Sequence, residues 1–292
     1  MSTLFYLRNR ITLSPRTKSL GILALILFAG VMLSLFDVHL VSSASNSVDV
    51  VRVVEAVPTD PQSDMWDRAK ESEIPMSAQQ IYQPGGGTTR SVKVRALEDG
   101  QTIAVRVSWT DESRNDTLGS QPSDAAAVQF PIDPTNLPYQ CMGQSSSKVN
   151  IWQWKAALEK QGMDNVSVAS MEAAGTRNLT SNGICKAVDS PGVEPRARSY
   201  HDGQMWHVVF YRALYEGDFA SAPLARGVNS AVAFGIWNGA QGEARGMKSV
   251  STWNSLLFET TEENEVGNIA TLGLVIAISA GAVAYAMKRF AS

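Results

Sequence analysis

An uncharged apolar stretch of membrane length lies near each end of the sequence. The first runs from Leu20 to Phe36 and the second from Ile269 to Met287. Because an α-helix rises about 1.5 Å per residue, roughly 20 residues cross a hydrocarbon core about 30 Å thick. The second stretch meets that length, and the first reaches it once flanking residues are counted. Both stretches predict transmembrane helices, so the chain is expected to act at a membrane.

Charge predicts the orientation of these two helices. Six basic residues flank the stretches on the sides toward the chain ends: Arg8, Arg10, Arg16, Lys18, Lys288 and Arg289. Basic flanks stay on the cytoplasmic side, so the segment between the stretches is expected to be extracytoplasmic. Residues 38–266 hold 27 acidic and 19 basic residues, a net charge of −8. An acidic domain binds nucleic acid poorly, and we expect no nucleic-acid partner.

The first apolar stretch has a second interpretation. A basic start, an apolar run and the small residues of 41–44 also describe a cleavable signal peptide. Residues 1–44 are therefore a cytoplasmic n-region with either a signal peptide or a signal anchor. The remaining boundaries are an extracytoplasmic domain at 45–266, a C-terminal transmembrane helix at 267–288 and a cytoplasmic tail at 289–292.

The middle of the chain shows mainly strand patterns. Polar and apolar residues alternate with a period of two, which places one face of a strand on a core. The segments are 91–96, 102–109, 126–130, 149–154, 204–212 and 229–237. The best helical pattern is short, at 155–162. These features predict a mainly β fold, an antiparallel β-sandwich with few short helices.

Three other regions are expected to lack regular strands. Residues 56–92, which include Gly85, Gly86 and Gly87, read as an irregular entry to the domain. The glycine triplet is not followed by a helical pattern, so we interpret it as a flexible turn and not as a phosphate-binding loop. Residues 112–126 and 161–200 read as long loops.

The sequence shows no catalytic constellation. Cys141 and Cys185 could form a disulfide outside the cytoplasm, but no C-x-x-C pair supports an iron–sulfur cluster or covalently attached haem. His39, His201 and His207 are scattered and do not have the spacing of a zinc site. No nucleophile motif such as G-x-S-x-G occurs. We therefore expect no substrate chemistry in this chain alone.

Two methionines in predicted loops are the remaining candidates for metal chemistry. Met142 lies between two predicted strands, and Met247 follows the last one. A thioether is a soft ligand that suits haem iron or copper. A lone methionine is more often a filler of the hydrophobic core. Composition alone does not decide between these two roles.

An ordered set of motifs resembles a known family. Between about residues 90 and 256, the chain resembles the haem b-binding gamma-type subunits of type II dimethyl sulfoxide reductase-family molybdoenzymes. The motifs are Val107-Ser-Trp-Thr-Asp111, Asp124-Ala-Ala-Ala-Val-Gln-Phe-Pro131, Cys141-Met-Gly143, Val149-Asn-Ile-Trp-Gln-Trp-Lys-Ala156, Trp206-His-Val-Val-Phe-Tyr-Arg212, Val232-Ala-Phe-Gly-Ile-Trp-Asn-Gly239 and Lys248-Ser-Val-Ser-Thr-Trp253.

The resemblance implies one haem b in a β-sandwich, with a methionine and a lysine as axial ligands of the iron. Met142 falls on the methionine motif and Lys248 on the lysine motif. Met247, next to Lys248, and His207, on a predicted strand, are the rival ligands. A surface lysine is normally solvated, so the assignment of Lys248 depends on the resemblance.

The resemblance also implies a role and partners. It predicts an electron-transfer subunit that relays electrons between a molybdopterin catalytic subunit with its iron–sulfur subunit and another carrier, membrane-bound or soluble. The C-terminal apolar stretch departs from the familiar members, which are typically soluble after export, and it favours a membrane partner. Two alternatives remain: a membrane-anchored β-sandwich that binds sugar or protein, and an anchor subunit without haem.

Overall fold

The structure is a computed structural model that describes residues 47–81, 85–139, 142–163, 175–184, 186–214, 217 and 220–259. Both apolar stretches, and with them the predicted transmembrane helices and cytoplasmic tail, lie outside these residues. Within the described part of the chain, no helix is long and apolar enough to cross a membrane.

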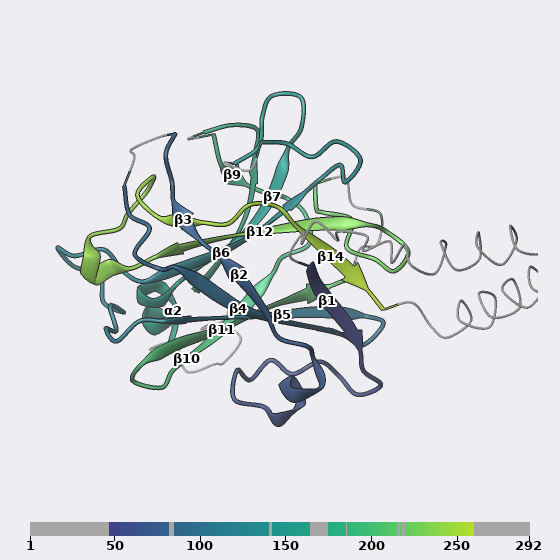
Figure 1. Cartoon of the computed structure of the whole chain (residues 1–292), viewed down its shortest axis with the longest axis horizontal. Helices are drawn as coiled ribbons and strands as arrows, with labels where there is room; N and C mark the ends of the chain where they lie inside the picture. Colours follow the sequence, from purple (N-terminus) through teal and green to yellow (C-terminus); the bar gives the residue numbers. More distant parts are fainter. Residues whose placement is uncertain are drawn as a thin grey trace, which may run out of the picture. The chain divides into compact units, whose positions relative to one another are not determined.

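The described chain is mainly β, with one short α-helix and two 3₁₀ turns (Figure 1). The strands are β1 (Ser47–Arg52), β2 (Ser72–Pro75), β3 (Ser77–Ala78), β4 (Ser91–Glu98), β5 (Thr102–Thr110), β6 (Ala125–Pro131), β7 (Val149–Lys155), β8 (Thr176–Ser181), β9 (Val188–Asp189), β10 (Arg196–His201), β11 (Met205–Ala213), β12 (Ser230–Trp237), β13 (Ser249–Val250) and β14 (Asn254–Phe258). The helical elements are η1 (Asp64–Arg68), α2 (Ala156–Met163) and η2 (Gly239–Gln241).

The strands form one continuous sheet that folds into two layers. The strand order is β10-β11-β5-β4-β1-β14-β12-β6-β7-β8-β9; β2 lies beside β4, β13 beside β12, and β3 beside β13. Strand β12 joins the layers, because Ser230–Val232 pair with β14 whereas Ala233–Trp237 pair with β6. We call the half from β10 to β14 the first layer and the half from β12 to β9 the second layer. Figure 1 shows them one below the other.

The main core lies between the two layers. The second layer contributes Phe130, Trp152 and Phe234, and the first contributes Trp109 and Phe210, all buried. In a strand, successive side chains point to opposite faces, so every second residue of β6, β7 and β12 enters this core. The intervening residues then lie on the outer face of the second layer, and that face positions the candidate site.

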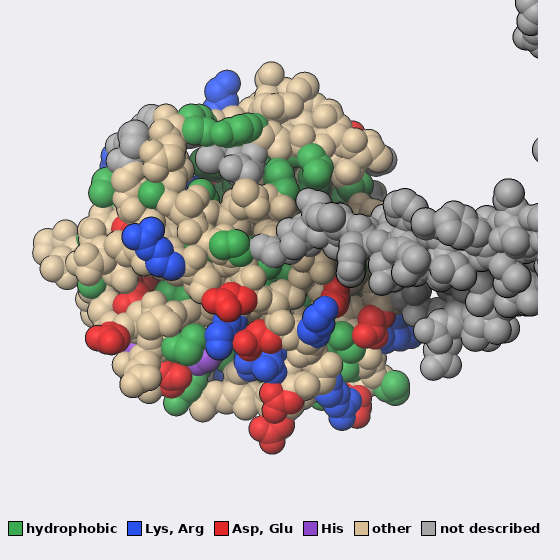
Figure 2. Space-filling model, in the orientation of Figure 1, with side chains coloured by type: hydrophobic (Ala, Val, Ile, Leu, Met, Phe, Trp, Pro, Cys, Tyr) green, Lys and Arg blue, Asp and Glu red, His purple; other side chains and the backbone are tan. Residues whose placement is uncertain are grey.

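The outer face of the first layer carries a smaller cluster and many charges. Trp66 of η1 is fully buried there against Leu97 and Ala104. Salt bridges link Arg95 to Asp67 and other acidic neighbours on the surface nearby. In Figure 2, charged side chains of both signs gather over the lower part of the molecule. Exposed ion pairs contribute little stability, so this face is a solvated surface.

The sequence predicted the central strands correctly and missed the irregularly patterned ones. The six expected strands correspond to β4, β5, β6, β7, β11 and β12, and the expected helix to α2. The prediction of long loops at 161–200 is wrong, because β8, β9 and β10 lie there. The prediction of a purely antiparallel sheet is also wrong, because β1 pairs in parallel with both β4 and β14. These strands are short or polar, so their alternation does not stand out from loop sequence.

Candidate functional site

A cavity of about 740 Å³ lies on the outer face of the second layer. Its volume falls within the roughly 300–1,000 Å³ typical of small-molecule and cofactor sites. Strands β6, β7, β8 and β12 line it together with the loops that cover them. All of β6 and β12 is buried, including the residues that do not enter the main core. The covering loops therefore shield β6 and β12 from solvent and leave a cavity under them.

Small side chains form the middle of the cavity lining. Ala127 of β6 pairs with Gly235 of β12, and Ala233 pairs with Gln129 two residues along. Because these side chains are small, they leave room in the cavity above the sheet for a broad, flat molecule. Larger apolar side chains, such as Ile151, line the neighbouring strands.

Met142 enters the cavity from the loop between β6 and β7. Its side chain is partly buried and packs against the outer cluster that includes Val149, Ile151 and Leu179. Its backbone is left-handed, with φ of 63°. Among the described non-glycine residues, only Met142 and Arg245 have positive φ, and both line the cavity. Strained backbone of this kind clusters at ligand-binding positions.

Lys248 lines the same cavity from the other side of β12. Its ammonium nitrogen lies 4.7 Å from the centre of the Trp237 ring, and its backbone carbonyl accepts a hydrogen bond of 3.0 Å from the Gln79 N–H. The contact with the indole face orients the side chain over an apolar surface. The structure thus places Met142 and Lys248, which are 106 positions apart in the sequence, in the lining of one cavity.

A glycine of the predicted flexible turn also lies close against the backbone of Lys248. Gly86 has φ of +77°, and a Cβ atom added to it would lie 2.5 Å from the backbone nitrogen of Lys248. Only glycine allows both this conformation and this close approach of two backbones. We interpreted Gly85-Gly86-Gly87 as a flexible turn, but Gly86 packs tightly against the segment that carries Lys248. Triplet glycines gave no signal that distinguishes these two roles.

The rival ligands lie elsewhere. Met247 is 36% exposed and is not among the residues that line the cavity. His207 is on β11 of the first layer, where Nδ1 is 2.8 Å from the Ser108 hydroxyl and Nε2 is 3.3 Å from the Asp202 carboxylate. Burial is the largest influence on His207 and lowers the pKa of its imidazole, which favours the neutral ring.

The charged side chains that line the cavity are mostly cationic. Lys155, Arg177, Arg245 and Lys248 are the basic ones, and Glu243 is the acidic one. The Glu243 carboxylate already accepts hydrogen bonds from the backbone N–H groups of Thr88 and Asn238, both 3.0 Å long. The cavity therefore offers positive charge to a ligand, although the whole chain has a net charge of −3.

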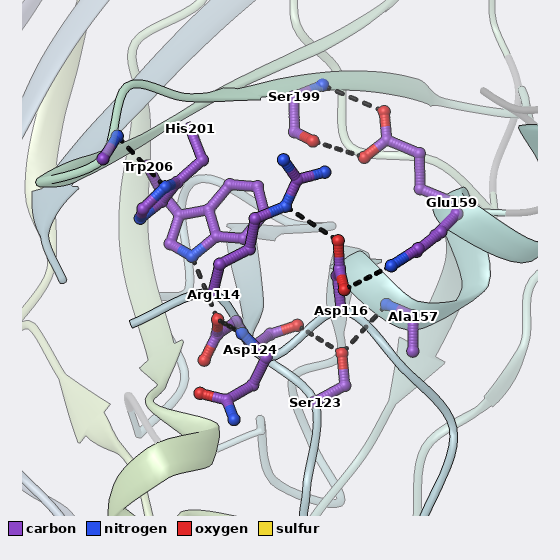
Figure 3. Close-up of polar contacts among 12 residues, drawn as sticks. Arg114, Asp116, Ser123, Asp124, Ala157, Glu159, Ser199, His201 and Trp206 are labelled. Carbon is purple, nitrogen blue, oxygen red and sulfur yellow. Dashed lines mark hydrogen bonds and ion pairs between the residues drawn. The ribbon is translucent and has the colours of Figure 1, made fainter. Parts of the chain in front are cut away.

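Buried carboxylates tie the Lys155 end of the cavity to the first layer (Figure 3). Asp124 precedes β6 and accepts from the Trp206 indole N–H of β11 at 3.1 Å and from the Gly239 N–H at 2.8 Å. Glu159 of α2 accepts from the Trp154 indole N–H at 2.6 Å and from the Ser199 N–H of β10 at 3.0 Å. These bonds hold the end of β7 and the start of α2 rigidly, and Lys155 lies between them.

Burial also sets the protonation of Asp124. It raises the pKa of Asp124 to about 6, against hydrogen bonds from Gly239, Asn115 and Trp206 that favour the charged form. The native state then binds more protons than the unfolded state between about pH 4 and 6, so this carboxyl's contribution to stability is full below that window and is lost as pH rises through it.

We therefore expect Asp124→Asn to remove part of the pH dependence of unfolding. From pH 4 to pH 7, wild type should lose up to about 3 kcal/mol of free energy of unfolding relative to Asp124→Asn. Urea unfolding at several pH values measures it. Asp202→Asn is the control, because hydrogen bonds from Gln204 and Met205 hold the pKa of Asp202 at about 2, below this window. Equal pH slopes for wild type and Asp124→Asn would contradict the assignment.

Several predicted features lie outside the described residues or find no counterpart within them. Cys141, Cys185 and His39 are outside, so the possible disulfide stays a prediction. In the parts of the chain that the structure describes, no group of three or more His, Cys, Asp or Glu side chains could hold a metal ion. His201 is held by the Asp111 backbone carbonyl, 2.8 Å from its Nε2.

Comparisons with known proteins identify the family. The family model described as ethylbenzene dehydrogenase matches residues 63–190. A Haloferax mediterranei protein named respiratory nitrate reductase heme subunit is 31% identical over 214 residues, 72% of each chain. Chlorate reductase subunit gamma of Ideonella dechloratans is 25% identical and covers 75% of this chain and 87% of its own length.

A third relative agrees with these two. Dimethylsulfide dehydrogenase subunit gamma of Rhodovulum sulfidophilum is 27% identical and covers 70% of this chain and 78% of its own length. The family model covers the motifs up to residue 156 on which the resemblance was based. The chain belongs to the family of gamma-type subunits of dimethyl sulfoxide reductase-family enzymes.

Proposed function

We propose that this chain is the electron-transfer subunit of a molybdoenzyme complex and holds one haem b in the cavity of the second layer. The observation that carries the proposal is that Met142 and Lys248 line one cavity of suitable size. The relatives support it, since one is named a heme subunit and the others are gamma subunits of redox enzymes.

The donor set fits a haem. The cavity lining includes the Met142 thioether and the Lys248 amine, which would hold the iron, and small residues such as Ala127 and Gly235 would leave room for the ring. When bound, the haem supplies a one-electron carrier. As a ligand, Met142 would favour the ferrous state and raise the potential. Lys248 would hold the iron through its neutral amine, so it would have to give up its proton and its contact with Trp237.

Under this proposal the partners are a molybdopterin catalytic subunit and an iron–sulfur subunit, with a membrane-bound or soluble carrier at the other end of the chain of electron transfer. Gamma subunits are by their names parts of larger enzymes, as the chlorate reductase relative illustrates. The chain itself is expected to have no turnover alone. Its role is to hold the haem at a fixed position and potential between two other redox centres.

The proposal predicts haem in the purified full-length protein. We expect a Soret band and sharp α and β bands on reduction, with one haem per chain, and co-purification with molybdenum and iron–sulfur subunits from gently solubilised membranes. Optical spectra, a pyridine haemochrome assay and mass spectrometry measure these. A colourless protein would favour the binding module or the haem-free anchor, and a haem protein that purifies alone would contradict the partner assignment.

We also propose that residues 45–266 are extracytoplasmic and that the C-terminal apolar stretch anchors the chain, whether the first stretch is a cleaved signal peptide or a second anchor. The supporting observation is that basic residues flank both stretches, with Lys288 and Arg289 directly after the second one. A reporter that reads compartment, fused after Ser292, is expected to register as cytoplasmic, and the haem domain should stay with membranes after alkaline washing. An exported reporter would contradict this topology.

A further inference from the structure

Among the residues that the structure describes, a half-buried cation in the cavity lining, Lys155, has no carboxylate partner. Lys155 ends β7, is half-buried and lines the cavity. Among the described residues, no carboxylate pairs with it, and the charged group that acts on it most strongly is another cation, Arg177. Burial and that cation lower the pKa of the Lys155 ammonium. Burying an unpaired charge is costly, so such a side chain is expected where a ligand supplies the missing anion.

Arg177 stands beside Lys155 on the same face. Gln153 pairs with Arg177 across β7 and β8, so Lys155, two residues beyond Gln153, is its diagonal neighbour. Diagonal neighbours lie about 7–8 Å apart at Cβ, within reach of long side chains. Arg177 is anchored at the rim by an ion pair of 2.8 Å with Asp189 of β9, and both partners are exposed. The two cations together therefore form one edge of the cavity.

Paired residues on neighbouring strands connect Lys155 to the strand end beside Lys248. Lys155 pairs with Ala125, and Ala125 pairs with Trp237, over whose ring the Lys248 ammonium lies. Strands are spaced about 4.8 Å apart, so Lys155 lies about two strand spacings, or roughly 10 Å, from the strand of Trp237. A flat molecule whose centre is near Lys248 can therefore reach Lys155 with an edge.

We propose that Lys155, with Arg177 beside it, is the carboxylate-binding edge of the cavity and receives the propionate groups of the porphyrin. This inference rests on the proposed function. Iron protoporphyrin IX carries two propionates on one edge, and an ammonium with a guanidinium beside it can pair with two carboxylates through charge-assisted hydrogen bonds. The pairing fixes which edge of the ring enters first and hence the rotation of the ring in the cavity.

Lys155 has a competing role, since a half-buried amine could itself bind iron. Charge-conserving substitution separates the two roles. Arginine keeps the positive charge and can pair with a carboxylate, but its guanidinium stays protonated and cannot donate a lone pair to a metal. Lys155→Arg should therefore preserve a propionate site and abolish an iron ligand.

The test compares two porphyrins on haem-free full-length protein in detergent. One is iron protoporphyrin IX and the other is its dimethyl ester, in which both carboxylates are neutralised. We expect wild type to prefer the free acid by about tenfold or more, because hydrogen bonds to charged groups each contribute more than neutral ones. Lys155→Gln should bring the ratio close to one, and Lys155→Arg should keep it.

Lys148→Gln is the matched control, since Lys148 precedes the same strand, is exposed and does not line the cavity. It should keep the wild-type ratio. An unchanged ratio in Lys155→Gln, or a wild type that binds both porphyrins equally, would overturn the inference and leave the proposed function standing. Loss of the low-spin spectrum in Lys155→Arg would make Lys155 an iron ligand and overturn it as well. Binding of neither porphyrin by wild type would overturn the proposed function itself.

Discussion

Met142→Ala is expected to open one coordination site on the haem iron. The iron should shift from low spin toward high spin and its midpoint potential should fall, because the thioether stabilises the ferrous state. Lys248→Ala should open the other coordination site with a comparable spin change. Lys248→Arg should not restore the low-spin state, because a guanidinium does not lose its proton. Optical and electron paramagnetic resonance spectra with redox titration measure these effects.

The controls for this prediction are the rival ligands. Met247 is exposed beside the site, and His207 is hydrogen-bonded in the other layer of the fold. Met247→Ala and His207→Ala should leave the spin state unchanged. A high-spin shift in either of these variants, with none in Met142→Ala or Lys248→Ala, would contradict the ligand assignment even if the protein holds haem.

Gly86→Ala is expected to have the second largest effect on haem binding, although Gly86 is not itself a proposed iron ligand. The added Cβ would lie 2.5 Å from the backbone nitrogen of Lys248 and 3.0 Å from its Cα, so the backbone of Lys248 must move. A left-handed alanine costs about 1–2 kcal/mol, and forced repacking adds roughly 1–3 kcal/mol. We expect a loss of about 2–5 kcal/mol in free energy of unfolding and weaker haem retention.

Gly227→Ala separates backbone strain from displacement of Lys248. Gly227 has φ of +74°, close to the +77° of Gly86, but nothing lies within 4 Å of an added Cβ. Its variant should lose only the cost of the left-handed alanine and should retain haem as wild type does. Chemical denaturation and the rate of haem transfer to an acceptor globin measure the two effects. Equal effects in both variants would show that the contact with Lys248 has no consequence.

The sequence predicts the central strands because both faces of these strands are patterned. Along β5 and β7, polar and apolar residues alternate in the sequence itself, although most residues of both strands are buried in the fold. β8 and β10 lie among polar residues, and β9 and β13 are two residues long, so pairing with neighbours and not local pattern makes them strands. The parallel pairing of β1 depends on partners more than 40 positions away and has no local signal.

The candidate site was predicted in part. Met142 and Lys248 came from motif resemblance, and the cavity that both line could not be foreseen, because it depends on which loops cover the second layer. Lys155 reads in sequence as an ordinary charged residue at a strand end, and only its burial beside Arg177 distinguishes it. Gly86 is similar, since a close approach of two backbones 162 positions apart leaves no mark on the local sequence.

The most direct test of the account is to locate the iron. Diffraction from crystals of the haem-loaded protein at the iron absorption edge gives an anomalous peak that locates the metal independently of the protein atoms. We predict one peak in the cavity of the second layer, within bonding distance of Met142 Sδ and Lys248 Nζ. A peak between the two layers, beside His207, or bonded to Lys155 would contradict the central claim.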